Sequence, residues 1–294
     1  MFRSLLFVLF LFLGTAMAAP IPHDVKKVVT FILIDDGKGG LIPNGTGFFV
    51  GVQDPANPKR HFVYLATARH VISPKPFGPL YPQVYVRLTK KTGGTEIVKI
   101  PLISTGPNRS VFVHADSSVD LAVIPGLPSE EVFDFRFLPD ELITTKPKFV
   151  ELGISEGSEV FFAGLFTQFL GEQANYPVVR FGRVALLTPE KIPWGDKKME
   201  LYLLESSSFG GNSGSPVFFY LGSDRSPGNL IVGPPQIFLA GVMMGAYQDQ
   251  QPIGVIETAA IPVSRSNLGI SAVVPAYRLH ELLFSKEMQE SRTR

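Results

Sequence analysis

Three short motifs in this chain contain the residue types that nucleophilic catalysis by a hydroxyl group requires. Ser213 lies within G-G-N-S-G-S-P-V, His70 ends T-A-R-H, and Asp120 lies within V-D-L-A-V-I. A hydroxyl is a poor nucleophile at neutral pH unless a base takes its proton, and the base needs a third group to fix its tautomer. The three motifs therefore predict a catalytic triad of His70, Asp120 and Ser213.

Each member of this triad has competitors in the sequence. His70 follows a strand-like run and lies in T-A-x-H, whereas we assign the other histidines to surface or core positions. Those four are His23, His61, His114 and His280. Asp116 competes with Asp120, but it lies in a polar stretch. Asp120 interrupts an apolar run, where an unpaired carboxylate would be costly to bury, so we expect it to have a partner.

The motifs, in the order His, Asp, Ser, resemble those of the chymotrypsin-like serine proteases. The resemblance is strongest to the cysteine-free bacterial type, namely the protease domain of the HtrA-type proteases and the glutamyl endopeptidases. It implies an all-β fold of two six-stranded antiparallel β-barrels with a C-terminal helix. It also implies an acyl-enzyme intermediate, and an oxyanion hole formed by the backbone N–H groups of Gly211 and Ser213.

Two details separate the chain from related enzymes. Pancreatic proteases carry an Asp before the serine, which pairs with a newly cut N-terminus, but Asn212 occupies that position here. Activation by that route is therefore not expected. An α/β-hydrolase would order its triad Ser, Asp, His within G-x-S-x-G. Here Ser215 replaces the last glycine and only His280 follows, so we exclude that class.

The resemblance also implies where the primary specificity pocket lies. Ser207 falls at its base, Met243 and Met244 fall near the wall that pairs with the substrate backbone, and Gly269 leaves space at the last strand. No acidic residue stands at the base, and no histidine stands where glutamyl endopeptidases recognise a carboxylate. These positions predict a neutral, adaptable pocket that accepts uncharged side chains.

Short β-branched and aromatic runs, separated by Gly and Pro, predict the strands that position these residues. The first set is Val28–Ile34, Gly47–Val52, Phe62–Thr67, Val84–Leu88, Ile97–Ile103 and Asp120–Ile124. The second set is Val160–Leu165, Val178–Leu187, Leu201–Glu205, Val217–Leu221, Ile237–Val242 and Ile270–Val274. We expect a linker at Pro125–Lys148, surface loops at Thr188–Lys198 and Gly222–Pro235, and a closing helix at Pro275–Glu290.

The domain prediction has three parts. Residues 1–18 form a signal peptide, residues 19–130 a first barrel with His70 and Asp120, and residues 131–294 a second barrel with Ser213 and the helix. The signal has Arg3, the apolar run Leu5–Leu13 and small residues before Ala19. We expect its cleavage, although retention as an anchor is the alternative. Export without any cysteine favours a bacterial periplasm or an extracellular location.

Composition limits the possible partners. The formal net charge is +1, and no basic stripe is present, so a nucleic-acid partner is not expected. No H-E-x-x-H motif, cysteine cluster or phosphate-binding loop predicts a metal or cofactor. The expected partner is a protein or peptide substrate, with no stable membrane anchor after cleavage, and the oligomeric state is left open.

The predicted function is an exported serine endopeptidase. The alternative is a protease-like fold used as a binding module with little turnover.

Overall fold

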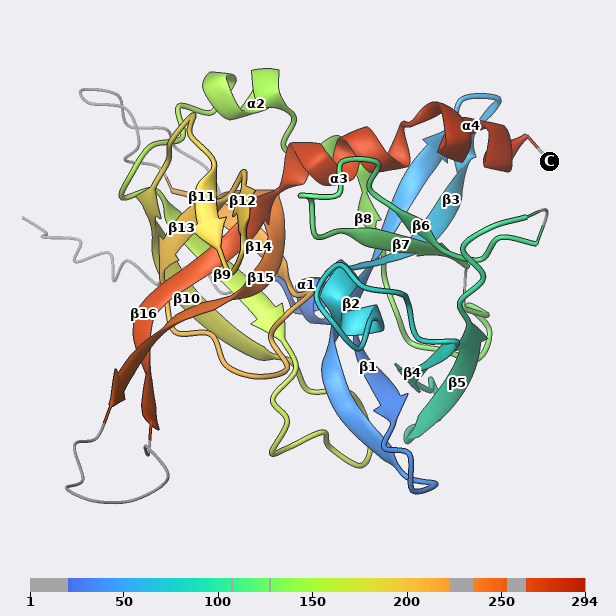
Figure 1. Cartoon of the computed structure of the whole chain (residues 1–294). Helices are drawn as coiled ribbons and strands as arrows, with labels where there is room; N and C mark the ends of the chain where they lie inside the picture. Colours follow the sequence, from blue (N-terminus) through green and yellow to red (C-terminus); the bar gives the residue numbers. More distant parts are fainter. Residues whose placement is uncertain (1–20, 107, 127, 223–234, 253–262, 294) are drawn as a thin grey trace, which may run out of the picture.

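The computed structural model describes residues 21–106, 108–126, 128–222, 235–252 and 263–293, and the fold is mostly β-structure (Figure 1). The predicted signal peptide lies outside the described residues, as do residues 223–234 of the loop predicted at Gly222–Pro235. The predicted domain boundaries remain predictions.

The first half of the chain forms one eight-stranded sheet. Its elements are α1 (His23–Lys27), β1 (Val29–Asp35), β2 (Leu41–Asp54), β3 (Asn57–Thr67), the 3-10 helix η1 (Arg69–Ile72), β4 (Gln83–Thr89), β5 (Thr95–Pro101), β6 (Phe112–Val113), β7 (Ala122–Pro125) and β8 (Leu138–Pro139). The strand order is β5-β4-β1-β2-β3-β7-β6, and β8 pairs with β2 in parallel. The sequence predicted a six-stranded antiparallel barrel here. The described strands instead form an open path, because the end strands β5 and β6 are not paired with each other.

The second half contains the closed six-stranded antiparallel barrel that the sequence predicted. Its elements are η2 (Asp140–Leu142), α2 (Lys146–Glu151), β9 (Glu159–Gly164), β10 (Val178–Leu186), β11 (Ile192–Trp194), β12 (Lys197–Met199), β13 (Tyr202–Glu205), β14 (Pro216–Leu221), β15 (Gln236–Pro252) and β16 (Val263–Pro275). The barrel order is β10-β13-β16-β15-β14-β9. The segment predicted as a surface loop at Thr188–Lys198 instead forms most of the hairpin β11–β12, and Gly195 adopts φ +57° in its turn.

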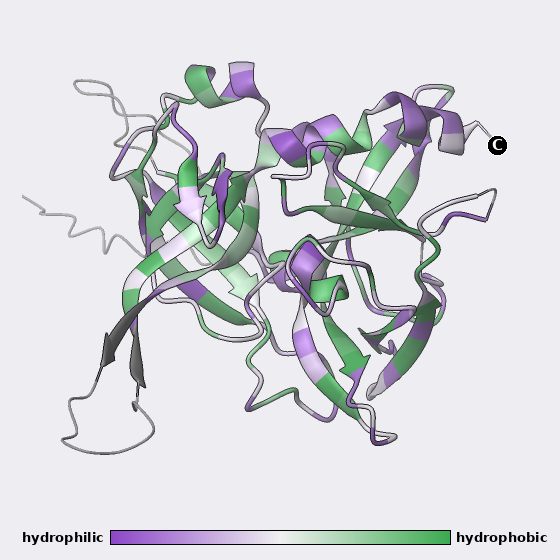
Figure 2. Cartoon of the chain, viewed as in Figure 1, coloured by the Kyte–Doolittle hydropathy of each residue, from purple (hydrophilic) through white to green (hydrophobic). Residues whose placement is uncertain are grey.

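Alternation along the first strands separates two hydrophobic clusters. Phe31 and Phe48 are buried in the same cluster as Phe161 and Phe218 of the barrel. Their sequence neighbours Ile32 and Phe49 point to the other face of the sheet and pack in a second cluster. Hydrophobic residues recur along the strands of both halves (Figure 2). One cluster therefore joins the sheet to the barrel.

Two helices follow the last strand, α3 (Ala276–Leu283) and α4 (Lys286–Arg292), where the sequence predicted one. The Ser285 hydroxyl accepts a hydrogen bond from Met288 N–H, so it caps a new helix at the break. Leu279 and Leu283 are fully buried in the cluster shared by both halves. In Figure 1 the pair runs from the barrel to the hairpin that joins β2 and β3.

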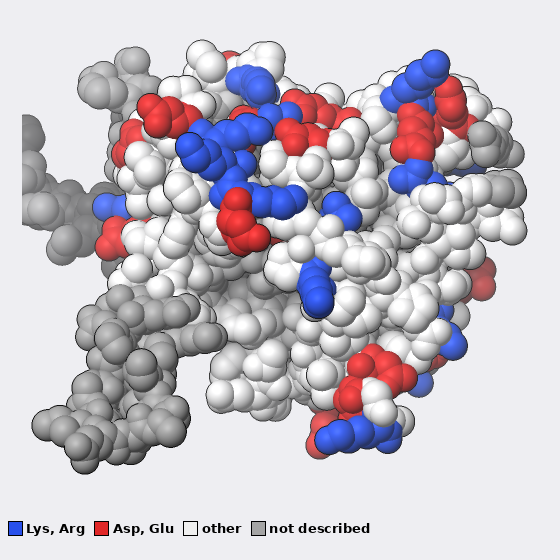
Figure 3. Space-filling view, in the orientation of Figure 1, with Lys and Arg blue, Asp and Glu red and all other residues white. Residues whose placement is uncertain are grey.

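Charges of both signs are interspersed on the face shown in Figure 3. Among the described helices, none has the length and apolar character needed to span a membrane.

Candidate active site

His70 and Asp120 form a pair at the edge of the first sheet. His70 lies in η1, directly after β3, and Asp120 lies just before β7, which pairs with β3. The Nδ1 atom of His70 is 2.5 Å from Oδ2 of Asp120. The backbone N–H of His70 donates to Oδ1 of the same carboxylate at 2.9 Å. Asp120 is 1% exposed, and these two bonds supply the partners that a buried carboxylate needs.

Two opposing effects act on the imidazole of His70. Burial lowers its pKa, but the negative charge of Asp120 and the hydrogen bond to it raise the pKa by more. The net result is a pKa above the ordinary value of 6.5. Because Asp120 occupies Nδ1, the other ring nitrogen, Nε2, is the one that can exchange a proton with a substrate or nucleophile.

Ser213 lies in a tight turn before β14. The turn is closed by the N–H of Asn212, which donates to Phe209 O at 3.0 Å, and by the N–H of Gly214, which donates to Met243 O at 2.7 Å. Gly211 and Gly214 adopt φ +96° and +84°, which non-glycine residues rarely adopt. Within the described residues, the N–H groups of Gly211 and Ser213 donate to no protein acceptor. Neither N–H group therefore takes part in holding the turn together.

The turn that contains Ser213 packs directly against β2, which pairs with β3. The N–H of Thr46 in β2 donates to Ser213 O at 2.8 Å, and the buried hydroxyl of Thr46 donates to Gly211 O at 2.7 Å. At the neighbouring Gly45, a Cβ atom would lie 2.6 Å from Val71 and 3.1 Å from Ser213 O. The structure thus brings His70, Asp120 and Ser213 into one neighbourhood. Sequence reasoning missed Thr46, whose only signal is a polar residue beside an apolar strand run.

The Ser213 hydroxyl has a specific partner. Its Oγ donates to the carbonyl oxygen of Met244 at 3.0 Å. In the described part of the chain it makes no hydrogen bond to His70. Catalytic hydrogen bonds are often long or misaligned before substrate binds.

A cavity of about 380 Å³ opens beside Ser213. Its lining comes from three segments far apart in the sequence. These residues are Ser208, Phe209, Gly210, Ser213, Gly245, Ala246, Gln248 and Asn267. The Asn267 amide is already bound, since it donates to Ser208 O at 2.6 Å and accepts from Gly269 N–H at 2.8 Å. Every side chain that the described part of the chain contributes to the lining is uncharged.

The structure brings only some of the predicted pocket residues to this cavity. Ser207 is exposed and does not line it, whereas its buried neighbour Ser208 does. Met243 and Met244 are buried with their side chains in the core clusters. Gly269 lies next to Asn267, with open space where a side chain would project. The cavity residues Phe209, Gln248 and Asn267 belong to no motif, so no sequence signal marks them.

Asn212 has a clear structural role. The residue is 4% exposed, and its side chain donates to Leu165 O at 2.8 Å and accepts from Phe209 N–H at 2.9 Å. These bonds fix the turn from inside the protein. Among the described residues, no cluster of three His, Asp or Glu side chains is arranged to hold a metal ion.

Comparisons with known proteins agree with this architecture. A family model described as the trypsin-like peptidase domain matches residues 45–223, more than half of the chain. A search of curated proteins finds no match. Among solved structures, the MamO protease domain from Magnetospirillum magneticum, in its apo form, is 17% identical with a TM-score of 0.50, covering 89% of this chain and 98% of its own. An inactive serine-to-alanine variant of Rv3671c from M. tuberculosis is 16% identical with a TM-score of 0.41, covering 91% and 95%.

Proposed function

The chain belongs to the trypsin-like peptidase domain family, and we propose that it is a serine endopeptidase with the triad His70, Asp120 and Ser213. The observation that carries this proposal is the 2.5 Å bond between His70 Nδ1 and the buried Asp120 carboxylate. That pair lies beside the glycine turn of Ser213. Such a bond orients an imidazole for use as a base.

In the proposed mechanism, Ser213 Oγ attacks the carbonyl carbon of the substrate peptide bond while His70 Nε2 takes the hydroxyl proton. Nε2 then gives that proton to the leaving amine as the carbon–nitrogen bond breaks. Water next attacks the acyl-enzyme, again losing a proton to Nε2, and the proton returns to Ser213. The free N–H groups of Gly211 and Ser213 stabilise the negative oxygen that develops in both steps.

One observation favours the second candidate, a binding module with little turnover. The Ser213 hydroxyl is hydrogen-bonded to Met244 O, so it must turn toward His70 before attack.

Labelling with a fluorophosphonate separates the two functions, because only an activated serine reacts with it. We expect the wild-type protein to be labelled, and Ser213→Ala and His70→Ala to remain unlabelled. Ser104→Ala, at an exposed serine of the first half, is the control. An unlabelled wild type of native fold would identify a binding module.

We propose a preference for uncharged side chains before the cut. The support is the uncharged lining of the cavity beside Ser213. A charge placed there would lose its hydration without gaining a partner, whereas one methylene changes discrimination by only about 1–3 kcal/mol. A peptide library should therefore show sharp rejection of Arg, Lys, Asp and Glu, with loose grading among Ala, Val, Leu and Met. A profile dominated by a charged residue would contradict this proposal.

We also propose export, with cleavage of the signal before Ala19 and a periplasmic or extracellular location. The support is the residue pattern of the first 18 positions together with the absence of cysteine from the whole sequence. The test is N-terminal sequencing of the protein recovered from a bacterial periplasm or culture medium. A mature chain that still begins at Met1 would contradict cleavage.

A further inference from the structure

Arg87 is a nearly buried cation in the middle of β4, on the first sheet, and is 7% exposed. Its guanidinium group reaches the segment 165–177, which connects β9 to β10 of the barrel. Nη1 donates to Leu170 O at 2.9 Å and to Asn175 Oδ1 at 2.6 Å, and Nη2 donates to Gly171 O. A buried cation must be solvated by the protein, and the planar fork of arginine binds several oxygens at once. Arg87 therefore fixes the path of this segment.

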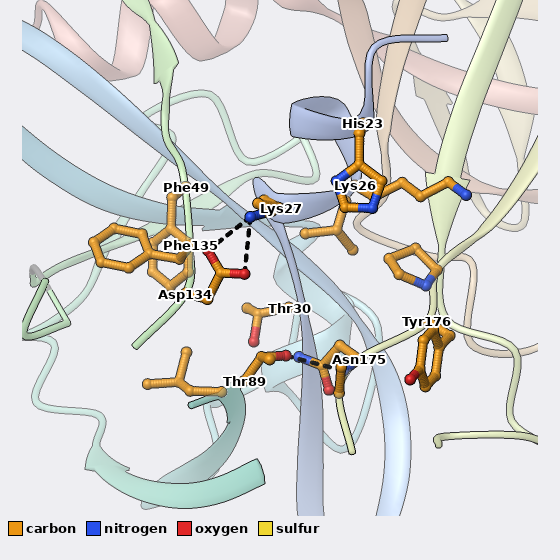
Figure 4. A pocket seen from close by; sticks show the side chains of 14 residues that line it. His23, Lys26, Lys27, Thr30, Phe49, Thr89, Asp134, Phe135, Asn175 and Tyr176 are labelled. Carbon is orange, nitrogen blue, oxygen red and sulfur yellow. Dashed lines mark hydrogen bonds and ion pairs between the residues drawn. The ribbon is translucent and has the colours of Figure 1, made fainter. Parts of the chain in front are cut away.

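The segment also bonds back to the strand. The side chain of Asn175 donates to Arg87 O at 2.6 Å, and its backbone N–H donates to the Thr89 hydroxyl at 2.9 Å. Figure 4 shows Asn175 beside Thr89 and Thr30, in the lining of a cavity of about 330 Å³ at this junction. The side-chain oxygen, the side-chain nitrogen and the backbone N–H of Asn175 are thus used in docking the segment onto β4.

The other end of the same segment supports the nucleophile turn. Leu165 O accepts the hydrogen bond from the Asn212 side chain, and Leu165 N–H donates to the Thr46 hydroxyl at 2.9 Å. A Cβ atom on Gly211 would lie 2.8 Å from the Thr167 side chain and 3.2 Å from that of Leu165. Residues 165–167 thus form the surface on which the turn with the free N–H groups rests.

We propose that Arg87 is a positioning residue for the proposed reaction: by holding segment 165–177, it keeps the Gly211 and Ser213 N–H groups aimed at the developing oxyanion. The inference rests on the proposed function. Oxyanion donors help most when they are placed before the reaction, because no reorganisation is then needed during it. The Leu165 end is held by Asn212 and Thr46, and the part around residues 170–175 is held by Arg87. Loss of Arg87 therefore removes an anchor of the segment and loosens the support of the turn.

The kinetic test compares Arg87→Met, Arg87→Lys and a control, Arg183→Met, whose side chain is 62% exposed on β10. Because a displacement of about 1 Å can cost about 100-fold, Arg87→Met is expected to lower kcat by roughly 10- to 100-fold while KM changes by less than about threefold. Its affinity for a peptide boronic acid, which forms a tetrahedral adduct with serine, should fall in parallel. Arg87→Lys should recover part of the loss, and Arg183→Met should match the wild type.

A second readout does not depend on turnover. In a Ser213→Ala background, Arg87→Met should speed hydrogen exchange both at 165–177 and at 209–214. Asn175→Ala, which removes only the segment's side of the contact, should give the same pattern to a smaller degree, and it replaces Arg87→Met if that variant does not fold. Unchanged exchange at 209–214, or a folded Arg87→Met with wild-type kcat, would overturn the inference. An unlabelled wild type with coupled exchange would instead refute the proposed function alone.

Discussion

Asp120 uses each of its carboxylate oxygens for a different atom of His70. Oδ2 receives the ring Nδ1, and Oδ1 receives the backbone N–H. The carboxylate thus fixes both the ring tautomer and the position of the residue that carries the ring. Asp116, the competing carboxylate, accepts from the Ser118 hydroxyl and N–H and lies farther out, with a side chain 39% exposed.

Asp120→Asn is expected to abolish most activity while the fold survives. An amide is nearly the same size but presents an N–H group to Nδ1, which selects the wrong tautomer. The equivalent change in another serine protease lowers kcat by about 10⁴-fold, and we expect a loss of about 10³- to 10⁴-fold here. The measurement is kcat/KM at matched folded content. Asp116→Asn is the control and should retain nearly full activity; the reverse ranking would assign the orienting role to Asp116.

The pH dependence of activity follows from the raised pKa of His70. The base must be neutral to accept the Ser213 proton, so activity is lost as the pH falls through this pKa. Since Asp120 raises the pKa, the midpoint of kcat/KM is expected above pH 6.5. Asp120→Asn removes the negative charge, and the midpoint of its residual activity should move to lower pH. A wild-type midpoint at or below 6.5, with chemistry rate-limiting, would argue against this pair as the base.

At the scale of elements, the glycines at the two ends of the Ser213 turn differ in how closely they approach the neighbouring strands. Gly214 adopts φ +84°, and a Cβ atom there would overlap the carbonyl oxygen of Thr46 and crowd the Thr67 hydroxyl. At Gly210, four residues earlier, a Cβ atom would meet no other atom within 4 Å. The same substitution should therefore have opposite outcomes at the two ends of one turn.

Gly214→Ala is expected to lower the free energy of unfolding by more than about 2 kcal/mol and to abolish fluorophosphonate labelling. The left-handed backbone and the overlap with β2 both oppose the added methyl group. Gly210→Ala is the matched control and should stay within about 0.5 kcal/mol of the wild type. Urea unfolding monitored by circular dichroism measures both variants. Equal stability of the two would show that the close approach of this turn to β2 is not formed in solution.

At the scale of the whole molecule, the C-terminal helices tie the halves together. Leu279, Leu283 and Met288 are buried in the cluster that also contains Tyr64 of the sheet and Phe218 of the barrel. In addition, the Arg292 side chain donates to the Tyr64 hydroxyl at 2.7 Å. The two halves share this cluster, so we expect them to unfold together.

Leu279→Ala is expected to lower the free energy of unfolding by about 2–5 kcal/mol, in a single transition. The substitution removes a fully buried side chain from the shared cluster. The control is Leu268→Ala, because Leu268 is 55% exposed and should change stability by less than about 0.5 kcal/mol. Unfolding is followed by Trp194 fluorescence for the barrel half and by hydrogen exchange at β1 and β2 for the sheet. Two separate transitions in the Leu279 variant would contradict coupling through this cluster.

The sequence by itself determined the strands of four or more residues and the residue types of the proposed triad, but not the short strands β6, β8, β11 and β12. Strand periodicity is local, and so are the glycines around Ser213 and the apolar run beside Asp120, because each depends on residues a few positions apart. Hence the predicted strands lie within or beside the observed ones. The bond between Asp120 and His70 also agrees with the expectation that a buried carboxylate needs a partner.

Only the tertiary structure decided how the strands close and what surrounds Ser213. Whether a sheet closes depends on the pairing of its end strands, which no local pattern encodes, and the first half differs from the predicted barrel for this reason. The cavity beside Ser213 is assembled from segments near positions 208, 246 and 267, which meet only through the pairing of β13, β15 and β16. The contact of Arg87 with segment 165–177 likewise joins residues that are distant in sequence. No local pattern marks its donors and acceptors, because they become partners only when folding buries them together.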